Sequence, residues 1–235
     1  MIEQAEVITQ LAKAHQDPLA GPLRIGAIPT LSPYLIPLIL KPLKKKYPQI
    51  KFILYEEMTD VLLKRLHNHE IDAALLATDV DRQEYNSIPL FDEPFWLAFP
   101  SKHPFYNKEK ITRRDLDDAD LLLLSEGHCL SKQAMDVCQL KERKNADKMS
   151  DLRASSLETL LQLVGAGYGT TLVPALAMSG SWASGSGIVA QKLEFKDAYR
   201  RISLVFRKTY PRQQALEAFM KIIVENLPNT VMPIK

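Results

Sequence analysis

The two cysteines of this chain, Cys129 and Cys138, lie nine positions apart in the segment EGHCLSKQAMDVC, and the chain has no other cysteine. Such a pair could be inert core thiols, metal ligands or a redox couple. Free cysteines are most often buried in protein cores. A zinc site is the weakest of the three interpretations, because His128, Cys129 and Cys138 do not form a standard ligand set.

A redox couple needs one cysteine that ionises readily, because the thiolate rather than the thiol is the nucleophile. Free cysteine has a pKa of about 8.5, so only a small fraction is ionised at neutral pH. The segment predicts a helix that begins near Cys129, just after Gly127 and His128. Free N–H groups and the positive end of the helix dipole favour a thiolate there, and His128 could add a charge or a hydrogen bond. Cys138 has no such help, so in a redox couple Cys129 would react first and Cys138 would resolve.

The elements that position this segment alternate between strand and helix. In the first half the patterns predict strand 23–29, helix 33–48, strand 50–57, helix 59–70 and strand 71–77. Thr59 is the expected N-cap of the second of these helices. The alternation predicts βαβ units and a largely parallel sheet.

The second half predicts a further α/β unit. Its expected elements are an extended segment at 87–101, a short helix at 111–118, a buried strand at 119–125, the cysteine helix, a helix at 156–169, strands at 188–195 and 200–207, and a closing helix at 211–227. Extended segments near 88–99 and 188–207 are candidate crossovers between the two units. Two α/β lobes joined in this way leave a cleft of the kind that binds small ligands.

The composition excludes several classes of protein. Hydrophobic residues make up 46% and charged residues 25%, as in ordinary globular proteins. Thirty basic against 28 acidic residues give a net charge of +2, which predicts neither nucleic-acid nor membrane binding by this chain. Glycines and Pro174 interrupt the uncharged stretch 159–191, so no membrane helix is expected there. The N-terminus does not resemble a signal peptide, and the sparing use of cysteine fits a reducing cytoplasm.

Several segments resemble the effector-binding half of the LysR-type transcriptional regulators. LVGAGYGTTLVPALA resembles that domain's glycine-rich helix end and strand, LRIGAIPT its first strand, and PLFDEPFWLAFPSKHP its first crossover. The resemblance runs from about Leu23 to Asn226. It implies an α/β fold of two Rossmann-like subdomains joined by two crossover strands, as in periplasmic binding proteins. Subdomain I would comprise 22–93 with 199–235, and subdomain II 94–198.

The resemblance also implies parts of the protein outside these subdomains. Residues 2–15 have helical apolar spacing, and residues 1–18 resemble the end of the family's linker helix. The winged helix-turn-helix DNA-binding domain that should precede this linker is absent from the chain. We therefore expect a regulatory part of a longer protein, which would form a homodimer or homotetramer and act on promoter DNA and RNA polymerase.

The cysteine segment is similar to that of the hydrogen peroxide-sensing members of this family, with RASSLETL behind it and GAIPT ahead of it. This similarity implies oxidation of Cys129 to a sulfenic acid and condensation with Cys138 to a disulfide. A thioredoxin- or glutaredoxin-type reductant would reverse the reaction. Hydrogen peroxide is then the ligand, and no cofactor, metal or membrane is implied.

The same similarity implies a set of ligand-binding residues: Thr30, Thr59, Gly127, His128, Leu130 and Arg200. The hydroxyls of Thr30 and Thr59 would line a pocket that faces Cys129 and would hydrogen-bond peroxide. Arg200 or Arg201 would support the thiolate, unless both are solvated ends of a strand. Ser131 and Lys132 stand where the family pattern has a basic–acidic pair, so the contacts that tune the reduced state are expected to differ.

Helix geometry sets a condition on the implied disulfide. Nine residues at about 1.5 Å and 100° each place Cys138 about 13.5 Å along the axis from Cys129 and half a turn round it. A disulfide needs Cα atoms within about 4.4 to 6.8 Å of each other. The bond therefore requires residues 126–138 to unwind, which would make the chemical event a conformational one.

Two other functions remain open from the sequence. One is a metabolite-sensing domain of the same fold, in which the cysteines are incidental. The other is an enzyme, a thiol peroxidase that turns over peroxide with the same thiolate chemistry. The chain contains no P-loop and no GxSxG motif, and we expect a sensor rather than an enzyme.

Overall fold

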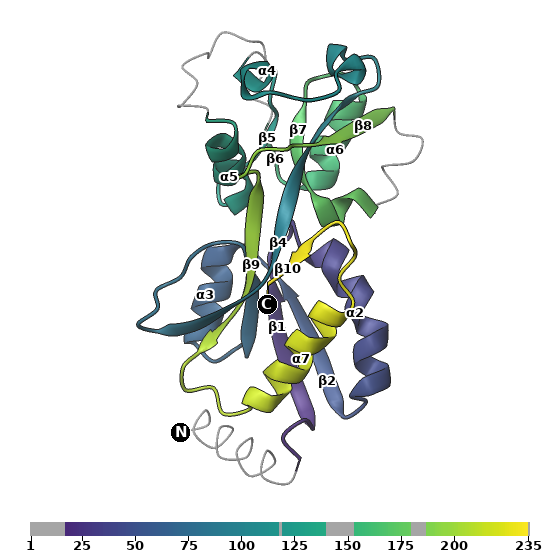
Figure 1. Cartoon of the computed structure of the whole chain (residues 1–235). Helices are drawn as coiled ribbons and strands as arrows, with labels where there is room; N and C mark the ends of the chain where they lie inside the picture. The colour runs from purple at the N-terminus through teal and green to yellow at the C-terminus, as the bar shows by residue number, and fades with distance from the viewer. Residues whose placement is uncertain (1–16, 118, 140–152, 180–186, 235) are drawn as a thin grey trace. The chain divides into compact units, whose positions relative to one another are not determined.

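Most of the strands and helices follow one another in the order that the sequence patterns predict, and Figure 1 shows them in a computed structural model of the chain. The structure describes residues 17–117, 119–139, 153–179 and 187–234. The contacts between residues divide the chain into two compact units. Unit 1 comprises the residues up to Phe91, Arg201–Asn229 and the residues from Pro233 on, and unit 2 comprises Asp92–Arg200 and Thr230–Met232. The limits expected from the sequence, 93/94 and 198/199, lie two residues from these divisions.

A mainly parallel sheet forms the core of unit 1. Strand β1 (Gly21–Ala27) lies between β2 (Ile50–Glu56) and β3 (Ala73–Leu76) and is parallel to both. Strand β9 (Tyr199–Arg207) pairs with β3 in the antiparallel direction, and β4 (Tyr85–Pro100) follows β9 in the sheet. The predicted strand–helix–strand–helix–strand order of the first half is therefore confirmed.

Three helices pack on this sheet: α2 (Ser32–Lys46), α3 (Thr59–His67) and α7 (Gln213–Glu225) (Figure 1). In α2 the side chains of Leu35, Ile39 and Leu43 recur at helical spacing and are buried. Leu62 and Leu66 of α3 are buried in the same way. Amphipathic periodicity thus predicts both the helices and the faces that they bury.

Unit 2 is built around the second part of β4. Strands β7 (Thr171–Pro174) and β8 (Ile188–Lys192) both pair with β4 in the antiparallel direction, on opposite sides of Leu97. A separate short parallel ladder joins β5 (Leu123–Leu124) to β6 (Arg153–Ala154). The remaining elements are α4 (Arg113–Asp117), α5 (Cys129–Val137), α6 (Leu157–Gly165), the 3-10 segments η1 (Pro104–Asn107) and η2 (Ala175–Ser179), and the short strand β10 (Met232–Pro233).

The predicted buried strand at 119–125 is wrong in extent, because only β5 forms a ladder there. The segment changes partner along its length. The Leu122 N–H donates to the Thr170 carbonyl at 2.7 Å, whereas the Ser125 N–H donates to the Ala154 carbonyl at 2.8 Å. A continuous ladder with one neighbour therefore cannot form.

The predicted N-cap at Thr59 is also wrong. Thr59 is the first residue of α3, and Met58 is the N-cap, with an extended backbone and no side-chain cap. The Met58 carbonyl accepts from the Leu62 N–H at 3.0 Å, so helical hydrogen bonding begins one residue earlier than the sequence suggests.

The predicted helix at 2–15 lies outside the described residues. Among the helices of the described ranges, none is both long and apolar enough to cross a membrane.

Candidate functional site

Cys129 is the first residue of α5, as the sequence predicts, and its side chain is partly exposed. The turn before it depends on Gly127, whose φ of +96° is a conformation that L residues rarely adopt. The His128 N–H closes this turn on the Ser125 carbonyl at 3.4 Å. The sulfur of Cys129 thus stands at the end of the helix where N–H groups and the helix dipole favour a thiolate.

Cys138 occupies the opposite end of the same helix. It is the C-cap of α5, and its N–H donates to the Ala134 carbonyl at 3.0 Å. Its side chain is buried, with 1% exposed, and neither cysteine is in a disulfide bond. Because the nine-residue helix is intact between them, the separation of about 13.5 Å along its axis applies to this structure. The cysteines therefore cannot pair in this conformation.

His128 is a buried ring oriented by a backbone contact. Its Nε2 lies 3.1 Å from the carbonyl oxygen of Ser155, and because a carbonyl oxygen only accepts, Nε2 is the donor. Burial lowers the pKa of His128, against a smaller opposing effect of the Ser155 contact. The sequence left two roles open for His128 beside Cys129, a positive charge and a hydrogen bond. The lowered pKa makes a positive charge at neutral pH the less favoured of the two.

Replacing His128 with glutamine is expected to reduce the loss of stability on acidification. The folded-state pKa of His128 lies below its ordinary value of 6.5, so the unfolded chain binds more protons as the pH falls through 6.5. Folding free energy is therefore lost from that pH down to the folded-state pKa. Urea midpoints at about pH 7.5 and about pH 5.5 should differ more in the parent than in the variant. His103, whose pKa burial also lowers, is common to both proteins, so equal differences would contradict a contribution from His128.

Packing and one hydroxyl fix the body of α5. Leu130, Ala134 and Val137 form its buried face. The Ser131 Oγ donates to the Leu124 carbonyl at 2.6 Å, which ties the first turn of α5 to the end of β5. Ser131 is one of the positions where the sequence departs from the family pattern. In this chain it supports the helical conformation directly.

Arg200 is fully buried and forms an ion pair with Glu93. Its Nε donates to Glu93 Oε2 at 2.8 Å, and neither side chain is exposed. The other carboxylate oxygen of Glu93 accepts from the Leu176 N–H at 2.8 Å. Arg201 is exposed on the other side of β9. The sequence left open which of the two arginines is buried, and in β9 Arg200 points inward and Arg201 outward. The interpretation of Arg200 as a solvated strand end is therefore wrong.

The predicted ligand-binding residues fall in both units. Gly127, His128, Leu130 and Arg200 lie in unit 2 with both cysteines, and Thr30 and Thr59 lie in unit 1. Thr30 is buried in the turn after β1, and Thr59 is half-buried at the start of α3. Their role in binding peroxide stays a prediction.

The sequence did not indicate those partners of the site residues that are backbone groups or lie far away in the chain. These are the Ser155 carbonyl for His128, Glu93 for Arg200, and Arg113 for the end of α5. A lone glutamate in an apolar strand, as in PLFDEPFWL, is the one signal that could have indicated Glu93, since buried charges are almost always paired. In the described part of the chain, no group of three or more histidine, cysteine or acidic side chains could bind a metal ion.

Comparisons of sequence and of structure agree on the kind of protein that this chain resembles. The family described as LysR substrate binding domain matches residues 16–228. The "Hydrogen peroxide-inducible genes activator" of Pectobacterium carotovorum subsp. carotovorum is 35% identical over 97% of this chain and 74% of its own length. The "DNA-binding transcriptional dual regulator OxyR" of Escherichia coli (strain K12) is 36% identical over 95% of this chain and 72% of its length. A solved structure of Corynebacterium glutamicum OxyR, a cysteine-to-serine mutant with hydrogen peroxide bound, has a TM-score of 0.84 at 35% identity, covering 96% of this chain and 70% of that one.

Proposed function

The chain belongs to the LysR substrate-binding domain family, and we propose that it senses hydrogen peroxide through Cys129 and Cys138. The family is one of transcriptional regulators, so the chain is a regulatory domain and not an enzyme. One observation carries the proposal. A partly exposed cysteine begins α5, and a buried cysteine ends it. This arrangement gives one thiol that peroxide can reach and a second that becomes available only when the helix opens.

The proposed chemistry has two steps. The Cys129 thiolate attacks one peroxide oxygen, the O–O bond breaks, and the departing hydroxide takes up a proton to become water. The sulfenic acid so formed then condenses with the Cys138 thiol, which forms the S–S bond and releases a second water. A dithiol reductant of thioredoxin or glutaredoxin type would reduce the disulfide by thiol exchange, as a cytoplasmic location would allow.

The second step requires α5 to unfold in part. The hydrogen bonds from the Cys138 N–H to the Ala134 carbonyl and from the Ser131 Oγ to the Leu124 carbonyl belong to the helical state. A disulfide within about 6.8 Å between Cα atoms is incompatible with that state. Oxidation would therefore replace helical hydrogen bonds of α5 with a covalent cross-link. The changed conformation of this segment would be the signal.

Stoichiometric peroxide is expected to give an intramolecular Cys129–Cys138 disulfide together with increased hydrogen exchange in α5. Intact mass should fall by two hydrogens, and peptide mapping should find the two cysteine peptides linked. Exchange should rise in the peptide that covers α5, because its backbone hydrogen bonds are lost. Helix α7, which belongs to unit 1, serves as an internal control whose exchange should not change. Linked cysteines with unchanged exchange in α5 would contradict the refolding, and unlinked cysteines would contradict the sensor itself.

A metabolite-sensing function with incidental cysteines is the alternative, and the matching family's description as a substrate-binding domain favours it. The two functions differ in what stabilises the chain. A small organic molecule that raises the melting temperature, with both thiols still reduced after peroxide treatment, would favour the alternative. A disulfide formed at stoichiometric peroxide, without any stabilising metabolite, would favour the peroxide sensor.

The remaining parts of the proposal concern the whole protein. OxyR relatives carry DNA-binding and activator descriptions, so we propose that the refolded α5 segment alters the arrangement of a dimer or tetramer on promoter DNA. Contact with RNA polymerase and activation of antioxidant genes would follow from that rearrangement.

A further inference from the structure

Arg113 contacts the end of α5 that must open. Its Nη1 donates to the Val137 carbonyl at 2.5 Å. Its Nη2 is paired with the carboxylate of Asp197, and the guanidinium lies over the ring of Phe195, with 4.6 Å from its central carbon to the ring centroid. The guanidinium of Arg113 thus joins the end of α5 to residues 195–197.

The Val137 carbonyl, which Arg113 binds, lies at the end of α5 beside Cys138. Val137 is the last residue of α5 and directly precedes Cys138. Carbonyls in the last turn of a helix have no N–H partner within the helix, and a cation there also complements the negative end of the helix dipole. A hydrogen bond from a guanidinium is stronger than one between neutral groups. Arg113 therefore stabilises the helical conformation at the residue next to the resolving cysteine.

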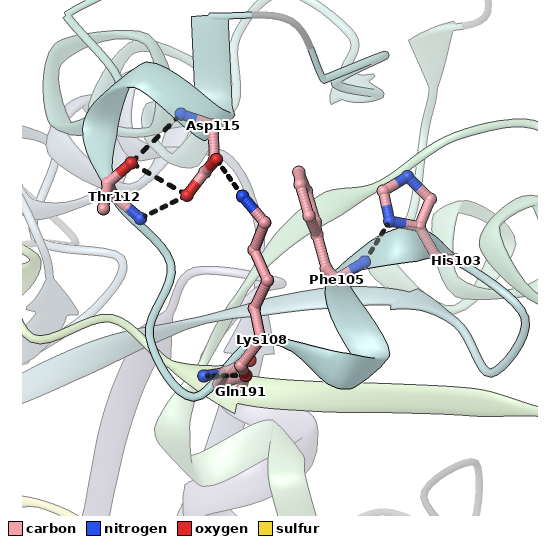
Figure 2. A network of polar contacts seen from close by, with 6 residues as sticks. All are labelled: His103, Phe105, Lys108, Thr112, Asp115 and Gln191. Carbon is pink, nitrogen blue, oxygen red and sulfur yellow. Dashed lines mark hydrogen bonds and ion pairs between the residues drawn. The ribbon is translucent and has the colours of Figure 1, made fainter.

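A separate network, drawn in Figure 2, includes Thr112 and Asp115, which flank Arg113 in the chain. The Thr112 N–H donates to Asp115 Oδ2 at 2.8 Å, and the Asp115 N–H donates back to Thr112 Oγ1 at 3.3 Å. Lys108 pairs with the other oxygen of Asp115. Gln191 of β8 donates to the backbone carbonyls of Lys108 and Glu109. These contacts hold the backbone at Arg113 in place independently of α5. The Arg113 side chain can therefore bind the Val137 carbonyl without moving with that helix.

The other partners of Arg113 lie just before a strand. Phe195 and Asp197 precede β9, and the Ala198 carbonyl accepts from the Phe95 N–H of β4 at 2.9 Å. The end of α5 and the approach to β9 are thus connected through one side chain. Opening of α5 would break the bond to Val137 and leave Arg113 with Asp197 and Phe195.

We propose that Arg113 is a positioning residue for the disulfide step: its contacts with Val137, Asp197 and Phe195, here called the Arg113 latch, keep Cys138 away from Cys129 until the latch releases. The inference rests on the proposed function, because it assigns a control on the second step of that chemistry. The latch touches neither peroxide nor sulfur. It acts on how often the end of α5 opens, and so on the rate at which the sulfenic acid becomes a disulfide.

The opening of α5 can be measured without peroxide, through alkylation of the buried Cys138 thiol by iodoacetamide in the reduced chain. Alkylation of a buried thiol requires local opening. Arg113→Ala should raise the alkylation rate of Cys138 about tenfold, as expected for loss of a charge-assisted hydrogen bond, and change that of Cys129 by less than about twofold. Arg113→Lys, which keeps the charge but loses the planar fork, should give a smaller rise.

Matched controls separate the latch from general destabilisation. Arg114→Ala removes an exposed arginine from the same helix and should leave both alkylation rates unchanged. Asp197→Asn removes the charge that orients Arg113 at a largely exposed position, so it should fold like the parent and still raise the Cys138 rate. If Arg113→Ala and Asp197→Asn raise the rates of both cysteines equally, with a lower urea midpoint, or raise neither, the latch is overturned.

Peroxide then tests the latch against the proposed function. In the parent, trapping of the sulfenic acid should precede the disulfide. Arg113→Ala should leave the first step unchanged and speed disulfide closure by the factor seen in alkylation. A parent that forms no disulfide overturns the proposed function, while the Cys138 alkylation rates still decide the latch. A parent that forms one at the same closure rate as Arg113→Ala overturns the latch and leaves the sensor in place.

Discussion

Replacing Cys129 with serine is expected to abolish the peroxide response of the chain. A serine hydroxyl is not ionised at neutral pH and does not form a sulfenic acid, so the first step has no nucleophile. Cys138 cannot take over, because its thiol is buried and lies at the carboxyl end of α5, away from the N–H groups that favour a thiolate. The rate of peroxide consumption at one equivalent should fall by roughly 10³-fold or more, as when the nucleophile of a covalent mechanism is removed. Stopped-flow peroxide consumption and intact mass measure this.

Cys138→Ser is the matched control, since it changes the same atom at the other end of the helix. This variant should still react with one equivalent of peroxide and should accumulate the Cys129 sulfenic acid, which a dimedone trap detects by mass. It should form no intramolecular link. A Cys129→Ser variant that reacts like the parent, or a Cys138→Ser variant that does not react at all, would contradict the assignment of the two roles.

The two cysteines show why separation can be a functional feature rather than a defect. A pair of thiols already in contact would be oxidised with little change in shape, and nothing would distinguish the oxidised chain from the reduced one. Here an intact helix lies between them, and the contacts of Ser131 and Arg113 stabilise it at its two ends. The free energy of the S–S bond must therefore exceed that of the local contacts, which is how one chemical event becomes a change of conformation.

The local features of the fold could be predicted from the sequence, because they depend on short-range patterns. Apolar spacing predicted the strands and helices of unit 1, and the glycine and histidine before Cys129 predicted where α5 begins. The error at residues 119–125 arose where hydrogen bonding depends on partners elsewhere in the chain, whereas at Thr59 the helix begins its hydrogen bonding one residue earlier than the residue types indicate. Periodicity describes which face of an element is apolar and contains no information about which strand pairs with it.

The electrostatic contacts of the site could not be predicted for the same reason. Glu93 and Arg200 lie 107 positions apart, and Arg113 and Val137 lie 24 apart. Val137 contributes a backbone carbonyl, which every residue has, so no residue type could reveal it. The sequence limited the reactive chemistry to the cysteine segment. Only the three-dimensional structure shows which groups hold that segment in its reduced form.

Replacing Arg200 with methionine is expected to destabilise the fold by about 3–5 kcal/mol, the largest effect on stability among these variants. The change leaves the Glu93 carboxylate buried with its ion-pair partner removed, since neither side chain of the pair is exposed. Urea unfolding at pH 7 measures the loss. Arg201→Met is the control, because the neighbouring arginine is exposed on the same strand and should cost about 0.5 kcal/mol or less.

The double variant Glu93→Gln, Arg200→Met separates the structural role of Arg200 from its proposed support of the thiolate. Glutamine keeps an oxygen for the Leu176 N–H while it removes the buried charge, so about half or more of the lost stability should return. If Arg200 also supports the Cys129 thiolate, this folded double variant should react slowly with peroxide at neutral pH and recover at higher pH, where the thiol ionises unaided. A double variant with the parent's stability and the parent's pH profile would show that Arg200 serves the fold alone, and the thiolate of Cys129 would then depend on the start of α5 without it.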